Sequence, residues 1–226
     1  MTAARDEATH DEATLAKLAA APNLKLPPPP HRVNGPDGRA LEYVMQDMTF
    51  LRKARNRISQ LLYNTIVTYI PSHLIRQGFL RLFGATIGKD SSILRGTNVL
   101  DIEFLTIGEC TSVGFRCMLD ARAGLSIGDN CTIASDVHIL GGGHDFNDPD
   151  FLPIPIPTVI EDYVWIGSRA MVLPCHIRRG GVVAAQALVT KDVGELEVVG
   201  GVPAKVITKR NPDALKYNAR YRPLFY

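Results

Sequence analysis

Residues 127 to 144 read IGDNCTIASDVHILGGGH, and isoleucine recurs in this stretch every six residues. A six-residue period keeps phase with neither a 3.6-residue helix nor a heptad, whereas branched residues suit short strands and glycine suits the corners between them. The pattern therefore predicts a parallel β-helix. The positions that carry it run well beyond this stretch, and all are isoleucine, valine or leucine: Ile87, Ile93, Val99, Ile107, Val113, Leu119, Ile127, Ile133, Ile139, Ile160, Ile166, Val172, Ile177, Val183 and Val189.

Taken in threes, these positions predict about five coils with three sides each. The steps within a coil are always six residues, and every irregular step falls between the third side of one coil and the first side of the next. Each coil contacts only its neighbours, so a solenoid tolerates insertions at one corner. The longest irregular step runs from Ile139 to Ile160. It predicts a loop over residues 144–159 that leaves the solenoid directly after three glycines.

The fifth residue of each hexad should also point inward, near the axis, where space is short. On the first two sides of every coil this residue is small, which supports the register independently. The residues are Ser91, Thr97, Thr111, Cys117, Cys131, Val137, Val164, Ala170, Gly181 and Ala187.

The repeat divides the chain into four segments. Residues 85–193 form the predicted β-helix domain. Residues 1–40 include a predicted short helix over residues 3–21 and a run of four prolines, and we expect a loosely ordered N-terminal arm. Residues 41–84 are predicted to be helical, and residues 194–226 form a C-terminal tail.

The helical segment has a basic start and an apolar continuation. One helix is predicted over residues 48–69 and ends before Pro71, and a second is predicted over residues 72–83. One interpretation packs this pair on the end of the solenoid. The other gives residues 48–83 a peripheral contact with a membrane surface that carries a lipid-linked substrate.

The composition narrows the class of function. The net charge of this 226-residue chain is +2, which argues against a nucleic-acid partner. The first ten residues are charged and lack an apolar signal core, so we expect a cytoplasmic protein, with the membrane periphery as the alternative. The four cysteines have no metal-ligand spacing, and Cys117 and Cys131 are expected to pack inside the solenoid.

Three motifs, in this order along the chain, allow a more specific comparison: IEDYVWIGS at 160–168, VTKDV at 189–193 and GGVPAKVI at 200–207. With them, residues 80–210 resemble the hexapeptide-repeat acyltransferases. Within this superfamily the chain is similar to the maltose/galactoside acetyltransferases, and more so to the colanic-acid-type polysaccharide O-acetyltransferases. The resemblance implies an all-β solenoid with left-handed coils, a homotrimer with active sites between subunits, and acetyl-CoA (coenzyme A) as co-substrate without a metal.

His144, at the start of the predicted loop, matches the catalytic histidine of this family. A neutral imidazole can accept the proton of a hydroxyl as that oxygen attacks a thioester. Asp120, at the same corner one coil earlier, and Asp145 are candidate acceptor-binding residues, and either carboxylate could orient the imidazole. Asp145 could instead hold the loop. For Asp148 we expect turn chemistry.

The resemblance also implies a cofactor-binding set, which comprises Trp165, Ser168, Ala185, Thr190, Lys191 and Lys205. The backbone N–H of Ser168 would face the thioester as an oxyanion donor. A family arginine falls on Thr208, where Lys209 or Arg210 could substitute. Gly114 occupies an acceptor-binding position of the galactoside enzymes, so we expect an acceptor other than a simple galactoside.

These observations predict an acetyl-CoA-dependent O-acetyltransferase that modifies a hydroxyl of a sugar or glycan precursor. An N-acetyltransferase of an amino sugar or an aminoglycoside-like molecule on the same fold is the main alternative. A non-catalytic scaffold is a further alternative. A metal-dependent hydratase would need three histidines on zinc. His138 and His144 lie on different sides of one predicted coil and His176 in a later one, which argues against it.

Overall fold

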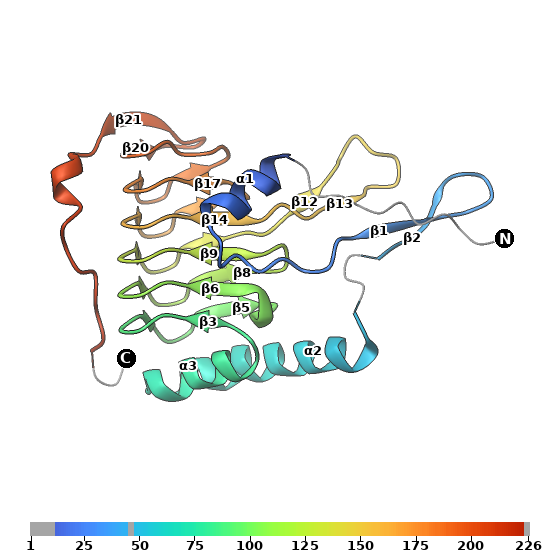
Figure 1. Ribbon diagram of the computed structural model, residues 1–226, viewed down its shortest axis with the longest axis horizontal. Helices are drawn as coiled ribbons and strands as arrows, with labels where there is room; N and C mark the ends of the chain where they lie inside the picture. The colour runs from blue at the N-terminus through green and yellow to red at the C-terminus, as the bar shows by residue number, and fades with distance from the viewer. Residues whose placement is uncertain (1–11, 45–47, 224–226) are drawn as a thin grey trace.

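The computed structural model describes residues 12–44 and 48–223, and a parallel β-solenoid forms most of it (Figure 1). The first side contains β3 (Thr86–Ile87), β6 (Leu105–Ile107), β9 (Leu125–Ile127), β14 (Thr158–Ile160) and β17 (His176–Ile177). The second contains β4 (Ser92–Ile93), β7 (Ser112–Val113), β10 (Thr132–Ile133), β15 (Trp165–Ile166), β18 (Val182–Val183), β20 (Glu197–Gly200) and β21 (Lys205–Lys209). The third contains β5 (Asn98–Leu100), β8 (Met118–Asp120), β11 (His138–Ile139), β16 (Met171–Val172) and β19 (Leu188–Val189).

The predicted hexad register is confirmed residue by residue. Along the first side, Ile87, Ile107, Ile127, Ile160 and Ile177 stack in parallel pairs, and the other two sides behave in the same way. All fifteen hexad positions are buried, and even Ile87 at the end of the stack is only 7% exposed. Burial of this aliphatic column is the main stabilising contribution to the solenoid.

The stack continues beyond the five predicted coils. Val193 bridges to Ile177, and Val199 pairs with Val183, so the chain makes about six turns. The prediction ended at Val189 because the next step, to Val193, is only four residues long. That short step falls at the corner where every other irregular step also falls.

The small inward residues connect successive coils through hydrogen bonds as well as packing. The hydroxyl of Ser91 donates to the Gly108 carbonyl (2.6 Å) and accepts from the amide of Thr111 (2.9 Å). Cys117 and Cys131 are fully buried, and burial raises the pKa values of their thiols to about 11 and about 12. Both thiols are therefore protonated near neutral pH, in agreement with the predicted packing role.

Two helices close the end of the solenoid at its first coil, as one of the two interpretations predicted (Figure 1). They are α2 (Phe50–Thr65) and α3 (His73–Leu82), joined by the 3-10 turn η1 (Val67–Tyr69). Their polar side chains satisfy the backbone groups that the first coil would otherwise leave open. The amide of Asn64 pairs with both backbone groups of Val99, and Arg76 and Gln77 donate to the carbonyls of Ile93 and Ser91.

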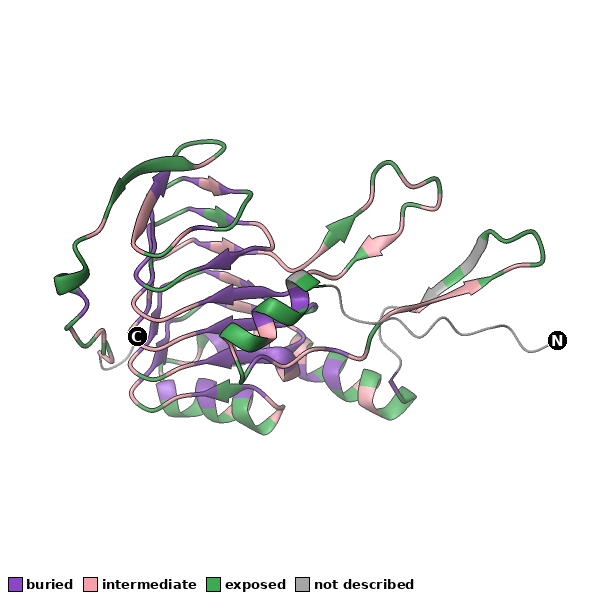
Figure 2. Ribbon diagram, turned by 45° about the horizontal axis from the view of Figure 1, so that its top comes forward, coloured by how far each residue is buried: buried purple, intermediate pink, exposed green. Residues whose placement is uncertain are grey.

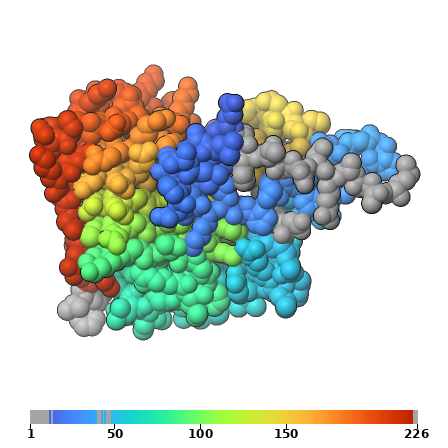
Figure 3. Space-filling model, in the orientation of Figure 1, coloured from blue at the N-terminus to red at the C-terminus, as the bar shows by residue number. Residues whose placement is uncertain are grey.

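The N-terminal arm lies against the solenoid, and Figure 3 shows it crossing one face. In α1 (Glu12–Ala20), the Lys17 ammonium is buried and donates to the Pro157 carbonyl (2.7 Å). Leu24 is buried, and Lys25 reaches the Gly84 carbonyl (2.7 Å). The expectation of a loose arm is therefore wrong for residues 12–25, because these side chains anchor it. Residues 3–11 of the predicted helix lie outside the described residues.

Residues 41–44 also differ from the helical prediction. They belong to β2 (Ala40–Val44), which pairs antiparallel with β1 (His31–Asn34). The intervening turn is closed by hydrogen bonds from the Gly35 amide to the Arg39 carbonyl and from the Gly38 amide to the Gly35 carbonyl. This turn reverses the chain and makes the strand pairing available. Helix α2, which follows in the described residues, begins at Phe50.

The C-terminal tail turns back after β21 and η3 (Pro212–Ala214) and runs down the solenoid toward α3 (Figure 1). It contacts the same corner of successive coils, through Tyr163, Asn130, Cys110 and Asp90, and its last described residue, Pro223, accepts a hydrogen bond from His73. The tail thus connects both ends of the solenoid. Among the described residues, no helix has the length and apolar character needed to cross a membrane.

Candidate active site

The 21-residue step between Ile139 and Ile160 forms a hairpin that projects from the solenoid (Figure 2). Its strands are β12 (Gly143–His144) and β13 (Pro153–Ile154), which pair antiparallel. Gly142 stands at its base with φ of +79°, a conformation that strongly favours glycine. A Cβ atom at Gly142 would also lie 2.8 Å from the carbonyl oxygen of Ile154, so the hairpin leaves the solenoid through a turn that excludes larger residues.

His144 is exposed on this hairpin and is oriented by Phe151. Its Nδ1 atom lies 2.9 Å from the Phe151 carbonyl oxygen, and the two rings stack at 4.3 Å with an interplanar angle of 7°. A carbonyl oxygen can only accept, so Nδ1 must carry the proton of this hydrogen bond. In the neutral imidazole, Nε2 is then left with its lone pair available to accept a proton from a substrate.

Asp120 does not contact His144; its partner is Arg122. Asp120 is 1% exposed, and its carboxylate accepts from the Arg122 backbone amide (3.1 Å), from Nε (2.9 Å) and from Nη2 (2.7 Å). The Arg122 side chain is 53% exposed. The buried carboxylate therefore holds an accessible guanidinium in a defined orientation.

Arg122 and His144 line the same cavity, which has a volume of about 140 Å³. The cavity lies between the base of the hairpin and the corner that carries Asp120. Gly141 packs so closely there that an added Cβ would lie 2.7 Å from the Asp120 carbonyl oxygen. The remaining lining is small or apolar and consists of Ala123, Gly141, Gly142, Gly143, Pro153, Ile154 and Pro155.

The two hairpin aspartates act within the turn. The carboxylate of Asp145 accepts from the amide of Asn147 (2.9 Å), and that of Asp148 accepts from the amide of Asp150 (2.7 Å). Turn chemistry was expected for Asp148. Of the two roles considered for Asp145, its contact fits holding the loop. The imidazole is held instead by Phe151, whose carbonyl binds Nδ1 of His144.

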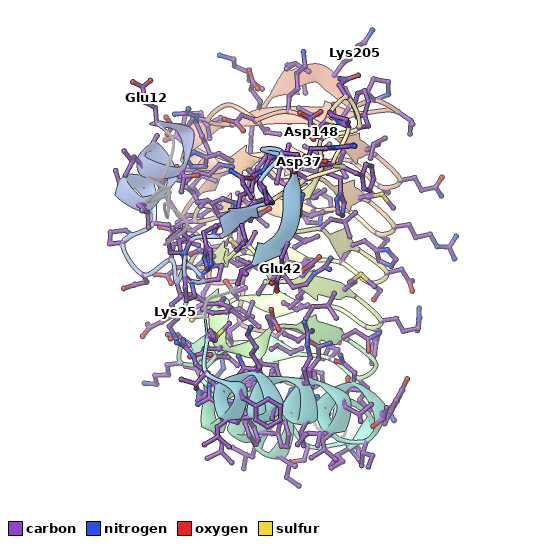
Figure 4. The ribbon with its side chains drawn as sticks, turned by 90° about the vertical axis from the view of Figure 1, so that its right-hand side faces the viewer. Glu12, Lys25, Asp37, Glu42, Asp148 and Lys205 are labelled. Atoms are coloured by element: carbon purple, nitrogen blue, oxygen red, sulfur yellow. The ribbon has the colours of Figure 1, made fainter. Side chains whose placement is uncertain are left out.

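A second hairpin braces this loop. Arg32, on β1, makes an ion pair with Asp150 (2.8 Å) and joins the N-terminal hairpin to the His144 hairpin. Figure 4 looks onto the side from which both project, with Asp37 of one turn and Asp148 of the other close together in the view. Arg32, Phe151 and Arg122 were not predicted from the sequence. For Arg122 alone a local signal was present, since it follows the candidate Asp120 by two residues.

The residues of the expected cofactor-binding set lie outside this cavity. Trp165, on the second side, is 51% exposed, and Ser168 and Ala185 are exposed at the corner between the second and third sides. Thr190 and Lys191 are exposed after the third side, at the corner from which the His144 hairpin leaves two coils earlier. Lys205 begins β21 and lies at the far end of the solenoid from α2 and α3 (Figure 4).

The backbone amide of Ser168 differs from its counterpart in an earlier coil. At the equivalent corner of an earlier coil, the Phe115 amide donates to the hydroxyl of Ser135 (3.1 Å). Ala185 occupies the corresponding place beside Ser168 and has no side-chain acceptor. In the part of the chain that the structure describes, the Ser168 amide donates to no acceptor. Arg210, the suggested substitute for the family arginine, instead donates to the Tyr163 carbonyl (2.8 Å).

Within the described residues, no group of three or more histidine, cysteine or acidic side chains could hold a metal ion. His176, which the hydratase alternative would require, is engaged with Glu161, the Nε2 and Oε1 atoms lying 2.6 Å apart.

No family model matches the chain. It is 33% identical over 149 residues to the Escherichia coli K12 protein named as the colanic acid biosynthesis acetyltransferase WcaF, covering 65% of this chain and 82% of the relative. A hexapeptide-repeat acetyltransferase of Vibrio cholerae, solved with acetyl coenzyme A, aligns with a TM-score of 0.62 and 25% identity over 70% of this chain and 87% of that one. A galactoside acetyltransferase in complex with coenzyme A shares the fold, with a TM-score of 0.65 and 23% identity over 80% and 92%.

The solenoid, its interruption by a histidine-bearing hairpin and these relatives define an acyltransferase built on a β-helix. The chain belongs to the hexapeptide-repeat acetyltransferase family. The predicted enzyme class and the all-β solenoid are confirmed, and the architecture is consistent with the left-handed coils expected from the resemblance.

Proposed function

We propose that the protein transfers an acetyl group from acetyl-CoA to a hydroxyl group of a sugar or glycan precursor, with His144 as general base. The observation that carries this proposal is the hydrogen bond between Nδ1 of His144 and the Phe151 carbonyl beside the 140 Å³ cavity. It leaves Nε2 as the proton acceptor at a site that a small polar acceptor could enter. The family relatives with acetyl-CoA and coenzyme A support the donor.

The reaction is a direct transfer between two bound substrates. Nε2 of His144 takes the hydroxyl proton as the acceptor oxygen forms a bond to the thioester carbonyl carbon. The backbone amide of Ser168 is the proposed donor to the resulting oxyanion. When the carbon–sulfur bond breaks, the coenzyme A sulfur leaves and takes the proton from Nε2, so the products are an acetyl ester and the free thiol.

Arg122 is proposed to bind the acceptor, with Asp120 acting through it. The guanidinium is the exposed member of the pair and lines the cavity with His144, whereas the Asp120 carboxylate is buried and occupied by Arg122. Asp145 is still proposed to contact the acceptor, and the reason is that it is the residue next to His144. An acceptor with several hydroxyl or acidic oxygens suits the exposed N–H groups of Arg122.

A homotrimer would complete the site. Trp165, Ser168 and Ala185 lie on another side and corner of the solenoid from His144, so a neighbouring subunit is proposed to bring its own set to each His144 cavity. Thr190, Lys191 and Lys205 are proposed to hold the pantetheine and phosphate end of coenzyme A. Exposed lysines are suited to binding phosphate groups.

Calorimetric titration with acetyl-CoA and coenzyme A tests the donor without knowledge of the acceptor. Saturable binding near one site per chain is expected. Absence of binding at millimolar ligand would overturn the donor assignment. A screen of sugar, amino-sugar and glycan acceptors that separates ester from amide products then tests the acceptor.

N-acetyl transfer remains the second candidate, because a general base at Nε2 serves an amine as well as a hydroxyl. Products that are exclusively amides would replace the O-acetyltransferase proposal with this one. Chains that bind acetyl-CoA and transfer acetyl to neither class would instead support a scaffold.

The trimeric site has its own test. Subunits that carry His144→Ala and subunits that carry Trp165→Ala are each expected to be inactive or impaired. If sites form between subunits, mixed assemblies of the two should contain some intact sites and regain activity. Recovery no greater than the sum of the separate variants would contradict a shared site.

A further inference from the structure

The α2 helix has a reversed amphipathic arrangement. Surface helices normally turn their apolar stripe toward the core. In α2 the face toward the solenoid is mostly polar: Tyr63 is buried there, but so are Asn56 and Ser59. Gln60 and Asn64 bond to the backbone of the first coil. The hydrogen-bonding needs of the open coil explain why this polar face lies inward.

The apolar face of the helical pair is consequently exposed at the end of the solenoid. Four of its side chains are between 77% and 82% exposed: Phe50, Leu51, Leu74 and Leu82. Single exposed apolar residues are common on protein surfaces, but a group of this size indicates an interaction surface. The other exposed members of this surface, which we call the helical end face, are Ile58, Leu61, Leu62, Ile66, Tyr69 and Ile75.

The charge of the same segment has one sign. From Met48 to Lys89 the chain contains no aspartate or glutamate. Its cations include Lys53, Arg55 and Arg57, all exposed on α2. Arg55 and Arg57 lie near the acidic groups that follow the first coil, Glu103 and Asp101, but both side chains remain about half or more exposed. The helical end face therefore combines large apolar side chains with a basic rim.

We infer that the helical end face docks on a membrane surface that contains anionic lipids. Apolar side chains would enter the headgroup region while the basic rim contacts lipid phosphates, the arrangement by which interfacial helices bind. A second copy of the chain fits less well, because two such faces would bring cations against cations. Docking would stand the solenoid on the membrane by its first coil.

Vesicle co-sedimentation with the full chain tests this inference. We expect binding to vesicles of phosphatidylcholine with phosphatidylglycerol, weaker binding to phosphatidylcholine alone, and release by salt from the anionic vesicles. The double variant Leu51→Ser/Leu74→Ser should reduce partitioning at least about tenfold, and Lys53→Glu/Arg57→Gln should remove the preference for anionic lipid.

The matched control is Leu15→Ser/Val206→Ser, which replaces two exposed apolar residues elsewhere and should bind like the wild type. Unfolding curves establish that each variant is folded. The inference would be overturned if the protein bound neither kind of vesicle. Equal binding by Leu51→Ser/Leu74→Ser and the wild type would also overturn it. So would concentration-dependent self-association abolished by that variant, which would assign the face to a second copy. Acetyl transfer is not measured, so these outcomes are independent of the proposed activity.

Discussion

The Phe151 carbonyl oxygen lies 2.9 Å from Nδ1 of His144, and the Phe151 ring stacks on the imidazole. Phe151 has φ of +48°, a conformation that non-glycine residues seldom adopt. This one residue therefore sets both the tautomer and the plane of the histidine through its backbone and its ring. The chemistry proposed for Nε2 depends on that arrangement.

Replacement of His144 by alanine should lower the rate of acetyl transfer at least about a hundredfold, because the acceptor hydroxyl would lose its proton acceptor. Coenzyme A release followed with a thiol reagent measures this. Acetyl-CoA affinity should change little, since the cofactor-binding set lies outside the His144 cavity. Turnover near the wild-type rate would eliminate His144 as the base.

Phe151→Ala keeps the carbonyl but removes the stacked ring. We expect kcat to fall about threefold to tenfold with little change in KM for acetyl-CoA, because the imidazole would sample unproductive orientations. Steady-state kinetics with varied donor and acceptor separates the two parameters. A purely structural role for Phe151 would instead lower stability while leaving kcat per folded molecule intact.

Arg122→Ala should raise the acceptor KM and lower stability, because it leaves the buried Asp120 carboxylate without its partner. Since Arg122 itself is about half exposed, we expect a loss of about 1–3 kcal/mol in the free energy of unfolding. Denaturant titration measures the loss. The double variant Asp120→Asn/Arg122→Ala should recover part of the stability but not the acceptor affinity, and full recovery of both would argue against an acceptor contact.

Gly142→Ala should loosen the hairpin that carries His144. The left-handed backbone at Gly142 disfavours a side chain by about 1–2 kcal/mol, and the added Cβ would clash with the Ile154 carbonyl. Limited proteolysis of the hairpin should be faster than in the wild type. Gly143→Ala is the matched control, because a Cβ at Gly143 meets nothing within 4 Å and the cleavage rate should not change.

Glu103 connects α2 to the first coil and should make stability depend on pH. Burial by itself would raise the pKa of its carboxyl, but hydrogen bonds from Arg52 and Asn56 and the charges of Arg52 and Arg55 hold the pKa below its ordinary value. A carboxyl with a lowered pKa stabilises the folded state at pH values above its ordinary pKa, and this contribution disappears as the pH falls through the folded pKa.

Glu103→Gln should therefore be less stable than the wild type near neutral pH, by about 1 kcal/mol because the arginines are partly exposed. The difference should shrink below about pH 4, where the wild-type carboxyl also becomes protonated. Thermal unfolding across this pH range measures it. A difference that is constant with pH would show that the ion cluster contributes nothing through its charge.

The sequence alone determined the solenoid, because the six-residue spacing of aliphatic residues such as Ile139 predicts which positions are buried. The corner from which the hairpin leaves was also readable there, as the step from Ile139 to Ile160 interrupts an otherwise regular period. The choice of His144 came from the resemblance to the family, through its place at the start of that loop, and its role stays a prediction. The sixth coil was missed because a four-residue step broke the phase before Val193.

Only the tertiary structure decided how the site is built. Arg32 and Asp150 are separated by 118 positions, and no local pattern predicts their ion pair. Likewise, Phe151 reaches His144 only because the hairpin folds back on itself. Lys17 is anchored by the Pro157 carbonyl, which is far away in the sequence. Periodic burial is encoded by neighbouring residues, whereas directional contacts between distant segments exist only once the coils have stacked and brought those atoms within reach.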